Sequence, residues 1–229
     1  MDQQTIRPTA AEVVVMGAGI IGAHNALQCA KRGFKVVLID NIAGQTLSYK
    51  VGESLLVFSN MFLRTISELD DYNSQAFPKD GVWFTYGMEG ATSFEGKAEW
   101  ALQSVIPQSM RNAFVNPRLL RALVDDVQIV RPEAETLLHK TARAHPNITF
   151  LDTARVKDAV INKDGTEHEV TWNFQTTGET GSIRTKWIID CSGRNRFLAK
   201  RMGHAVENVE CNSAASPIEI HGAVDCYRS

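Results

Sequence analysis

The hydrophobic residues of the first forty positions fall into two blocks that predict a β-α-β unit. Three consecutive valines within residues 12–16 suit a strand that is buried on both faces. An alanine-rich stretch that reaches Lys31 predicts a helix, and Gly33 suits the end of that helix. A second apolar run over residues 35–40 predicts another buried strand. We place this unit within residues 11–50.

The middle of the chain mixes helical and strand-like patterns. Apolar residues at helical spacing predict a helix over residues 55–69; they are Leu55, Phe58, Phe62, Ile66 and Leu69. Residues 81–86, which contain two aromatic residues, predict a strand. Asn116 followed by Pro117 is typical of a helix start, and we expect that helix to run through Val127. A further helix is expected to open at residues 131–132 and to close at Pro146.

The pattern changes to a β meander over residues 155–186. Its strands are expected at residues 156–161, at residues 168–174 and after Gly181, with a turn at Asp164-Gly165. Residues 187–202 then return to the main sheet, with a buried strand over 187–190 and a helix over 197–202, and residues 218–229 have strand character. The predicted fold is α/β: a Rossmann-type parallel sheet with a three-stranded β meander inserted before its last strand.

Composition and charge narrow the class of protein. The chain has 229 residues, 44% of them hydrophobic, and a net charge of -2, which does not favour binding to nucleic acid or to an anionic membrane. Residues 1–9 lack the pattern of a signal peptide, and the apolar run near residues 13–23 is interrupted by glycines. The cysteines, Cys29, Cys191, Cys211 and Cys226, form no CxxC pair. We expect a soluble cytoplasmic protein with reduced thiols and no metal site.

A G-x-G-x-x-G pattern lies between the first predicted strand and the first predicted helix, where it can bind a dinucleotide. Gly17 would allow the tight turn, Gly19 the approach of a pyrophosphate, and Gly22 close packing of the helix. Asp40 ends the second strand, where an acid accepts hydrogen bonds from a ribose. The cofactor-binding residues predicted here are Gly17, Ala18, Gly19, Ile20, Gly22 and Asp40. A glycine-rich turn without a ligand is the alternative, and the motif alone does not choose between NAD(P) and FAD.

Three later segments resemble flavoprotein monooxygenases and, more closely, flavin-dependent halogenases. They are Gly52-Glu53-Ser54, Arg131 at a helix start, and the strand end Asp190-Cys191-Ser192-Gly193. The resemblance extends over residues 12–202 and implies FAD as the cofactor. It implies that the Gly-Glu-Ser segment lies along the flavin, that Arg131 helps to hold the cofactor, and that the backbone from Asp190 to Gly193 comes close to it.

Each of these residues also has a simpler interpretation that the sequence leaves open. Glu53 could be a solvated turn residue, and Arg131 could be a surface arginine at a helix start. Asp190 could be a strand-end carboxylate that caps the turn after it.

The resemblance to halogenases depends most on Lys79, which precedes the aromatic strand over residues 81–86. Halogenases that this chain resembles carry a lysine there, at the far end of a tunnel from the flavin. The implied chemistry starts from reduced FAD (FADH2), oxygen and a halide ion, chloride or bromide, which together give hypohalous acid. The lysine would polarise the oxidant through its ammonium group, or form a haloamine, and direct the halogen onto an electron-rich ring. The alternative is a solvent-facing lysine in the turn Pro78-Lys79-Asp80-Gly81.

The chain departs from the family in two respects. Val57 stands where many halogenases have proline, and the W-x-W-x-I-P signature is absent. Since family members are about twice as long, we expect residues 1–229 to form one FAD-binding domain with only the start of a substrate-binding region. The implied partners are a separate flavin reductase and an aromatic substrate, free or tethered to a carrier protein. A monooxygenase or reductase of the same fold, and a truncated chain that catalyses nothing, are the alternatives.

Overall fold

The computed structural model describes residues 7–43, 52–66, 69–70, 72, 77–79, 81–93, 95–103 and 127–206. The first half contains β1 (Ala10–Met16), α1 (Ile20–Lys31), β2 (Val36–Ile39), β3 (Ser54–Leu55), α2 (Val57–Leu63), β4 (Phe77–Pro78), β5 (Gly81–Tyr86) and β6 (Ala98–Gln103). The second half contains β7 (Val127–Gln128), α6 (Arg131–Ala144), β8 (Ile148–Leu151), β9 (Ala154–Val160), β10 (His168–Phe174), β11 (Thr180–Asp190), a 3-10 turn (Gly193–Asn195) and α7 (Phe197–Arg201).

The main sheet has six strands in the order β8-β2-β1-β11-β10-β9. Strands β8, β2, β1 and β11 are parallel, and β10 and β9 continue the sheet in antiparallel pairing. This arrangement confirms the predicted α/β fold with a parallel sheet and a meander. The predicted β-α-β unit is present as β1, α1 and β2, and the structure describes it as far as Ala43.

Two features of this sheet differ from the prediction. Strand β8, which pairs with β2, was not predicted, because four residues after a helix give little periodicity. The meander is also not inserted before the last parallel strand, since β11 belongs to both parts. Its first half pairs with β10 and its second half with β1, where Val13 lies beside Trp187. Trp187 is 65% exposed, so the expectation that this strand is buried was wrong there.

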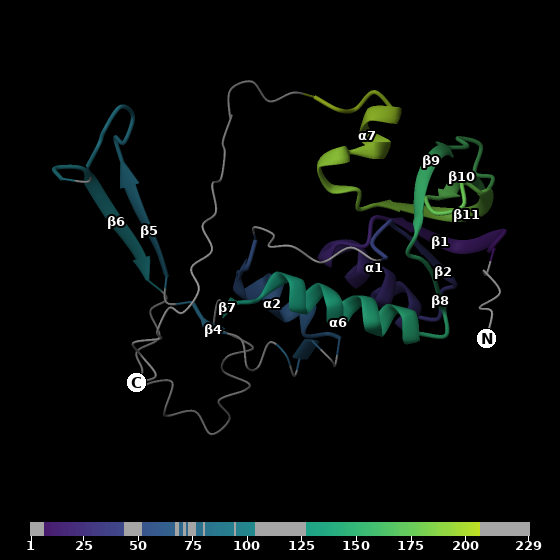
Figure 1. The fold of residues 1–229 in the computed structure, drawn as a ribbon, viewed down its shortest axis with the longest axis horizontal. Helices are drawn as coiled ribbons and strands as arrows, with labels where there is room; N and C mark the ends of the chain where they lie inside the picture. Colours follow the sequence, from purple (N-terminus) through teal and green to yellow (C-terminus); the bar gives the residue numbers. More distant parts are fainter. Residues whose placement is uncertain are drawn as a thin grey trace.

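Two apolar cores cover the two faces of the parallel strands. In Figure 1, α1 and α6 lie together on one side of β1, β2 and β8, and the β9–β11 meander rises on the other. Val13 and Val15 face the helices and pack with Leu27 and Leu138. Val14 faces the meander side, whose core includes Trp172. The alternation of the valines therefore supplies both cores, as expected for a strand buried on both sides.

Helix α6 is confirmed at the predicted position. Pro132 lies in its first turn, where a missing backbone N–H costs little, and the helix ends at Ala144, just before Pro146. The helix near residues 197–202 is present as α7. In the described part of the chain no helix has the length and apolar character needed to cross a bilayer.

The segment between the β-α-β unit and α6 differs most from prediction. Strand β5 is confirmed, but the helix expected over residues 55–69 is shortened to α2 (Val57–Leu63). Leu55 pairs with β7 instead, and Phe58 and Phe62 are 79% and 69% exposed. Val127, expected to end a helix, lies in β7 between β3 and β4. The start of that helix and the strand over residues 218–229 lie outside the described residues.

Candidate functional site

The turn between β1 and α1 requires glycine at two positions because other backbone lies against it. Gly17 has φ of 98°, and a Cβ atom there would lie 2.4 Å from the Cys191 carbonyl oxygen at the end of β11. A Cβ atom at Gly22 would lie 1.8 Å from the Gly17 carbonyl oxygen and 3.1 Å from Cys191 Cβ. Residues with side chains rarely adopt such a φ, and no side-chain adjustment relieves a clash with backbone.

Gly19 is different, because its surroundings are open. Its backbone is extended, with φ of -60°, and a Cβ atom there would meet no described atom within 4 Å. Gly19 is the N-cap of α1, whose first turn contains no acidic residue. The free N–H groups at the helix start therefore face an open side, which is the arrangement that binds anionic groups such as phosphates.

A groove runs past this helix start. It consists of a hollow of about 510 Å³ and another of about 430 Å³, which share Gly19, Cys191 and Gly193. The first is lined further by Ile20, Ile21, Gly22, Arg131, Asp190, Arg196 and Ala199. The second is lined further by Met16, Gly17, Ile39, Asp40, Arg155, Val156, Ser192, Asn195 and Phe197. Each volume is in the range of small-molecule sites, and the shared residues show that the two hollows adjoin.

The charges along the groove favour an anionic ligand. Arg131, Arg155 and Arg196 line it, and the N-terminal end of α1 adds a partial positive charge. Burial, and secondarily the carboxylate of Asp190, raise the pKa of the Cys191 thiol, which therefore remains neutral near pH 7. Cys191 thus contributes packing and no negative charge.

The two aspartates of the groove bind backbone N–H groups. Asp40 Oδ2 accepts a hydrogen bond from the Ala18 N–H at 2.6 Å, and its Oδ1 accepts one from Asn41 at 2.7 Å. Asp190 Oδ1 accepts one from Ser192 at 2.9 Å, and its Oδ2 accepts one from Leu198 at 2.7 Å in the first turn of α7. Asp190 thus caps the turn that follows β11, which is the simpler of the two interpretations that the sequence left open for this residue.

Arg131 lies between the groove and the Gly-Glu-Ser segment. Its Nη2 forms an ion pair with Glu135 Oε1 at 2.5 Å, and its Nη1 donates to the Gly52 carbonyl oxygen at 3.4 Å. A Cβ atom at Gly52, where φ is 107°, would lie 2.8 Å from Arg131 Nη1. Glu135 is only 1% exposed. Arg131 is thus a held, partly buried residue, which disfavours its interpretation as a surface arginine.

The remaining predicted residues lie outside the groove lining. Glu53 accepts a backbone hydrogen bond from Ile129 at 2.9 Å and precedes β3, which Ser54 opens. Lys79 is partly buried between β4 and β5. The structure therefore brings together the glycine turn, Asp40, Asp190, Gly193 and Arg131 around the groove. The Gly-Glu-Ser segment lies beside them through the contact of Gly52 with Arg131. Lys79 does not line the groove and follows β4.

Residues 10–226 match a protein family described as the FAD binding domain. The chain belongs to the FAD-binding domain family. The flavin-dependent halogenase armH3 of Armillaria mellea is 28% identical over 200 residues, which cover 85% of this chain and 34% of that protein. A 1H-pyrrole-2-carbonyl-[peptidyl-carrier protein] brominase of Pseudoalteromonas luteoviolacea is 25% identical, over 83% of this chain and 39% of that protein. The chain thus spans between a third and two fifths of these relatives.

Solved structures share the fold. The flavin-dependent halogenase CmlS superposes with a TM-score of 0.60 at 22% identity, over 85% of this chain and 31% of that one. The p-nitrophenol 4-monooxygenase PnpA of Pseudomonas putida superposes with a TM-score of 0.56 at 16% identity, over 86% of this chain and 44% of that one. Both likenesses concern the fold alone.

FAD suits the groove that the described residues form. The open side of Gly19 and the free N–H groups of α1 would receive the pyrophosphate, with Arg131 and Arg196 close to it. The hollow beside Asp40, Arg155 and Val156 would receive the adenosine.

Several residues of this site were not predicted from the sequence. Arg155, Arg196 and His139 belong to it through tertiary contacts, and Arg196 is the non-glycine residue with positive φ, 50°, among the described residues. Glu135 and His139 did carry a signal. They follow Arg131 at intervals of four, which places the three on one face of α6.

Proposed function

We propose that this chain is the FAD-binding part of a flavin-dependent halogenase that acts on an electron-rich aromatic compound. The proposal rests on the small sheet β3-β7-β4, because this sheet joins the Gly-Glu-Ser segment to Lys79. The names of two relatives, a flavin-dependent halogenase and a brominase, support the reaction class.

The register of this sheet gives the separation of the two segments. Ser54 and Phe77 both pair with Gln128, and Leu55 and Pro78 both pair with Val127. Neighbouring strands lie about 4.8 Å apart, so β3 and β4 lie roughly 10 Å apart. Lys79 follows β4 directly, and Arg131 comes three residues after β7 ends. Lys79 and Arg131 thus follow two neighbouring strands, β4 and β7, of one sheet.

The strand after Lys79 offers an aromatic surface. The rings of Phe84 and Trp100 stack at 4.5 Å between centroids, and Trp100 Nε1 donates a hydrogen bond to the Tyr86 hydroxyl at 2.8 Å. Phe84, Tyr86 and Trp100 remain 38%, 52% and 46% exposed, on the β5–β6 hairpin at the far left of Figure 1. An aromatic face on the strand that follows the lysine suits an electron-rich ring, which can stack on it.

Bound FAD, once reduced, would supply the electrons that activate oxygen for oxidation of the halide. Lys79 would then act on hypohalous acid in one of two ways. Its ammonium group can donate a hydrogen bond to the oxidant, which polarises the oxygen–halogen bond. Alternatively its neutral amine attacks the halogen, so that an N–halogen bond forms, the oxygen–halogen bond breaks, and water leaves with the amine proton. Either way the lysine would direct the halogen onto the electron-rich ring of the substrate.

For partners we propose a separate flavin reductase and a substrate presented on a carrier protein. The relative whose name specifies a pyrrole on a peptidyl carrier protein supports the second of these. We propose chloride or bromide as the halide. The name of this relative, a brominase, supports bromide.

The test is Lys79→Ala in the complete gene product, supplied with reduced FAD, oxygen and halide. We expect the halogenated product to form more than a hundredfold more slowly, equivalent to ~2.7 kcal/mol of barrier. FAD oxidation and peroxide release should continue. Lys79→Arg should also fail, because a guanidinium cannot form the same haloamine. Lys97→Ala is the matched control, since Lys97 precedes β6 as Lys79 precedes the paired strand β5.

A monooxygenase is the second candidate, because a p-nitrophenol 4-monooxygenase has the same fold. It predicts a hydroxylated product whose formation does not depend on halide. If Lys79→Ala retains halogenation, the lysine has no role in handling the oxidant. If product forms at equal rate without chloride or bromide, the monooxygenase replaces the halogenase. A chain that binds nucleotide and gives neither product would support the non-catalytic alternative.

A further inference from the structure

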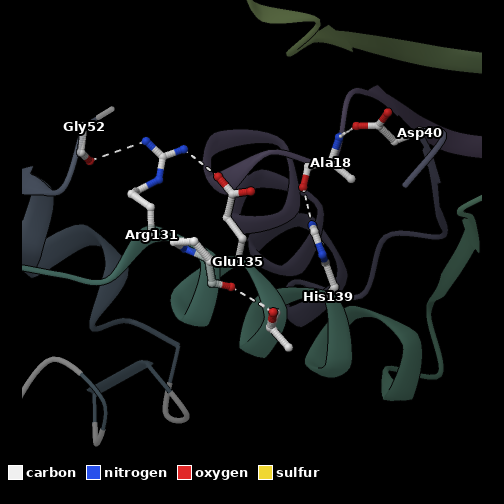
Figure 2. Close-up of polar contacts among 8 residues, drawn as sticks. Ala18, Asp40, Gly52, Arg131, Glu135 and His139 are labelled. Atoms are coloured by element: carbon white, nitrogen blue, oxygen red, sulfur yellow. Dashed lines mark hydrogen bonds and ion pairs between the residues drawn. The ribbon is translucent and has the colours of Figure 1, made fainter. Parts of the chain in front are cut away.

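The peptide groups on both sides of Ala18 are held by side chains from two different elements (Figure 2). The Ala18 N–H donates to Asp40 Oδ2 at 2.6 Å, from the end of β2. The Ala18 carbonyl oxygen lies 2.5 Å from His139 Nε2, on α6. A carbonyl oxygen can only accept, so His139 Nε2 must carry the proton and donate.

These two bonds set the direction of the groups next to them. The described chain contains no cis peptide, and in a trans peptide the C=O and the N–H point in opposite directions. With the Ala18 C=O turned toward α6, the Gly19 N–H is turned away from α6. With the Ala18 N–H turned toward Asp40, the Gly17 C=O is turned away from Asp40, and it lies against Gly22. No carbonyl oxygen of these two peptides is thus left to turn toward a phosphate.

His139 is well placed to impose this orientation. It is 4% exposed, and its ring lies 5.8 Å from that of Phe150 in β8. The Ala18 carbonyl precedes the helix N-cap Gly19, whose own carbonyl accepts the first helical hydrogen bond, from Ala23. The Ala18 carbonyl therefore lies outside the hydrogen bonding of α1 and depends on a side chain.

The face of α6 that carries His139 also carries Glu135 and Arg131, one turn apart from each other. Figure 2 shows the three in a row, with Arg131 directed at Gly52 and His139 at Ala18. One rigid helix thus contacts the glycine turn at one point and the Gly-Glu-Ser segment at another. Glu135, which is buried, fixes the Arg131 guanidinium between them.

We propose that His139 is a positioning residue for FAD: its Nε2–H holds the Ala18 carbonyl toward α6 and so presents the Gly19 N–H to the pyrophosphate. Loss of this donor would let the peptide rotate and place a carbonyl oxygen near the phosphates. The inference rests on the FAD-binding part of the proposed function and is independent of halogenation.

The experiment measures FAD and ADP affinity in the 229-residue chain with four variants. His139→Leu removes the donor, His139→Asn carries an amide too short to reach, and His139→Gln places an amide N–H near the position of Nε2. Lys140→Gln, at the exposed neighbouring residue, is the control. Flavin fluorescence quenching and calorimetry give the dissociation constants. Thermal unfolding without ligand, and amide hydrogen exchange over residues 17–23, report on the chain alone.

We expect His139→Leu and His139→Asn to raise the dissociation constants of FAD and ADP about tenfold or more, equivalent to ~1.4 kcal/mol. His139→Gln should stay within about threefold of the wild type, and Lys140→Gln should match it. Exchange over residues 17–23 should be faster in the leucine and asparagine variants than in the glutamine variant. If the leucine variant does not fold, the asparagine and glutamine pair still decides the question.

Two results would overturn the proposal. Wild-type affinity in His139→Asn would show that the donor is not needed. Equal weakening in His139→Asn and His139→Gln, in step with equal losses of thermal stability, would assign His139 a packing role only. A wild-type chain that binds neither FAD nor ADP would contradict the cofactor assignment, whereas the exchange comparison would still show whether His139 holds the turn.

Discussion

The β-α-β unit with α6 and the segment of residues 52–103 differ in how many large apolar side chains they leave exposed to solvent. In the first region Val14, Leu27, Leu38 and Leu138 have no exposed surface. In the second, Leu63 and Ile66 join the same core as Leu27, but Phe58, Phe62, Tyr86 and Trp100 are 46–79% exposed. Burial of a large apolar side chain is worth about 1.5–3 kcal/mol, so the first region carries most of the stability that the described residues provide.

The same contrast separates the two parts of the proposed chemistry. The first region holds its polar groups by hydrogen bonds of fixed direction, at Ala18, Asp40 and Arg131. The second region presents a partly buried Lys79 and an aromatic face in which Phe84, Tyr86 and Trp100 are 38–52% exposed. Polar groups held in fixed directions, as in the first region, suit a cofactor that stays bound. Clustered exposed apolar surface is more typical of a place where another molecule binds.

The largest effect is expected when the packing of the first region is broken at its tightest point. Gly22→Ala would place a methyl group 1.8 Å from the Gly17 carbonyl oxygen, on backbone that cannot move aside. We expect the free energy of unfolding to fall by about 4 kcal/mol or more, and we expect FAD binding to be lost as well. Urea denaturation followed by circular dichroism measures it. A stable Gly22→Ala variant would contradict the close approach of helix and turn.

Matched truncations in the two regions test the contrast itself. Leu138→Ala removes a buried side chain of α6 and should cost about 3 kcal/mol. Phe62→Ala removes a larger side chain from α2 that is 69% exposed, and it should cost less than about 1 kcal/mol. Both are measured by urea denaturation. Equal losses would mean that Phe62 is covered in solution and that the two regions do not differ as described.

Gly19→Leu separates cofactor binding from folding. The backbone at Gly19 is open to any residue, and the side chain would enter space without described neighbours, so stability should change by less than about 1 kcal/mol. FAD affinity should fall about a hundredfold, or ~2.7 kcal/mol, because the side chain would occupy the place of the pyrophosphate. Fluorescence titration checks it, with thermal unfolding as the control. Undiminished FAD binding in this variant would mean that the pyrophosphate does not bind beside Gly19.

The smallest effect is expected at the boundary of the two regions, at His24 on α1. Its ring nitrogens have no hydrogen-bond partner among the described residues, and its ring packs against the edge of Phe62 at 6.2 Å. Burial, and secondarily Lys31, lower the pKa of His24 below its usual 6.5. The unfolded chain therefore binds this proton more readily, and stability present above pH 6.5 is lost as the pH falls below it.

His24→Leu removes the titrating group and should lose less stability than the wild type between pH 7.5 and pH 5.5. Denaturation at the two pH values measures the difference. An identical pH dependence in both proteins would mean that His24 is not a source of acid sensitivity.

Local sequence was sufficient for the elements of the first region. The valine run, the glycine spacing and the Arg131-Pro132 start each determine a conformation within a few residues, so β1, α1 and α6 were predicted correctly. Asp40 was also placed at the glycine turn. Its bond to the Ala18 N–H, however, is an additional contact that the motif does not specify.

Prediction failed where pairing between distant residues decides the conformation. Leu55 fits a helical pattern, yet it forms a strand with Val127, and only β7 makes that pairing available. The short strand β8 needs β2 beside it, and β11 needs both β10 and β1 to extend without a break. Strand propensity depends on such partners more than helix propensity does.

The sequence by itself therefore determined the β-α-β unit, its glycines and the order of the cofactor segments, because backbone strain and apolar periodicity act over short distances. Only the tertiary structure decided which side chains meet. It placed His139 against Ala18, paired Arg131 with Glu135, and set Lys79 two strands from the Gly-Glu-Ser segment. Those contacts join residues far apart in the chain, and they form only when α6 and β7 have packed against the rest.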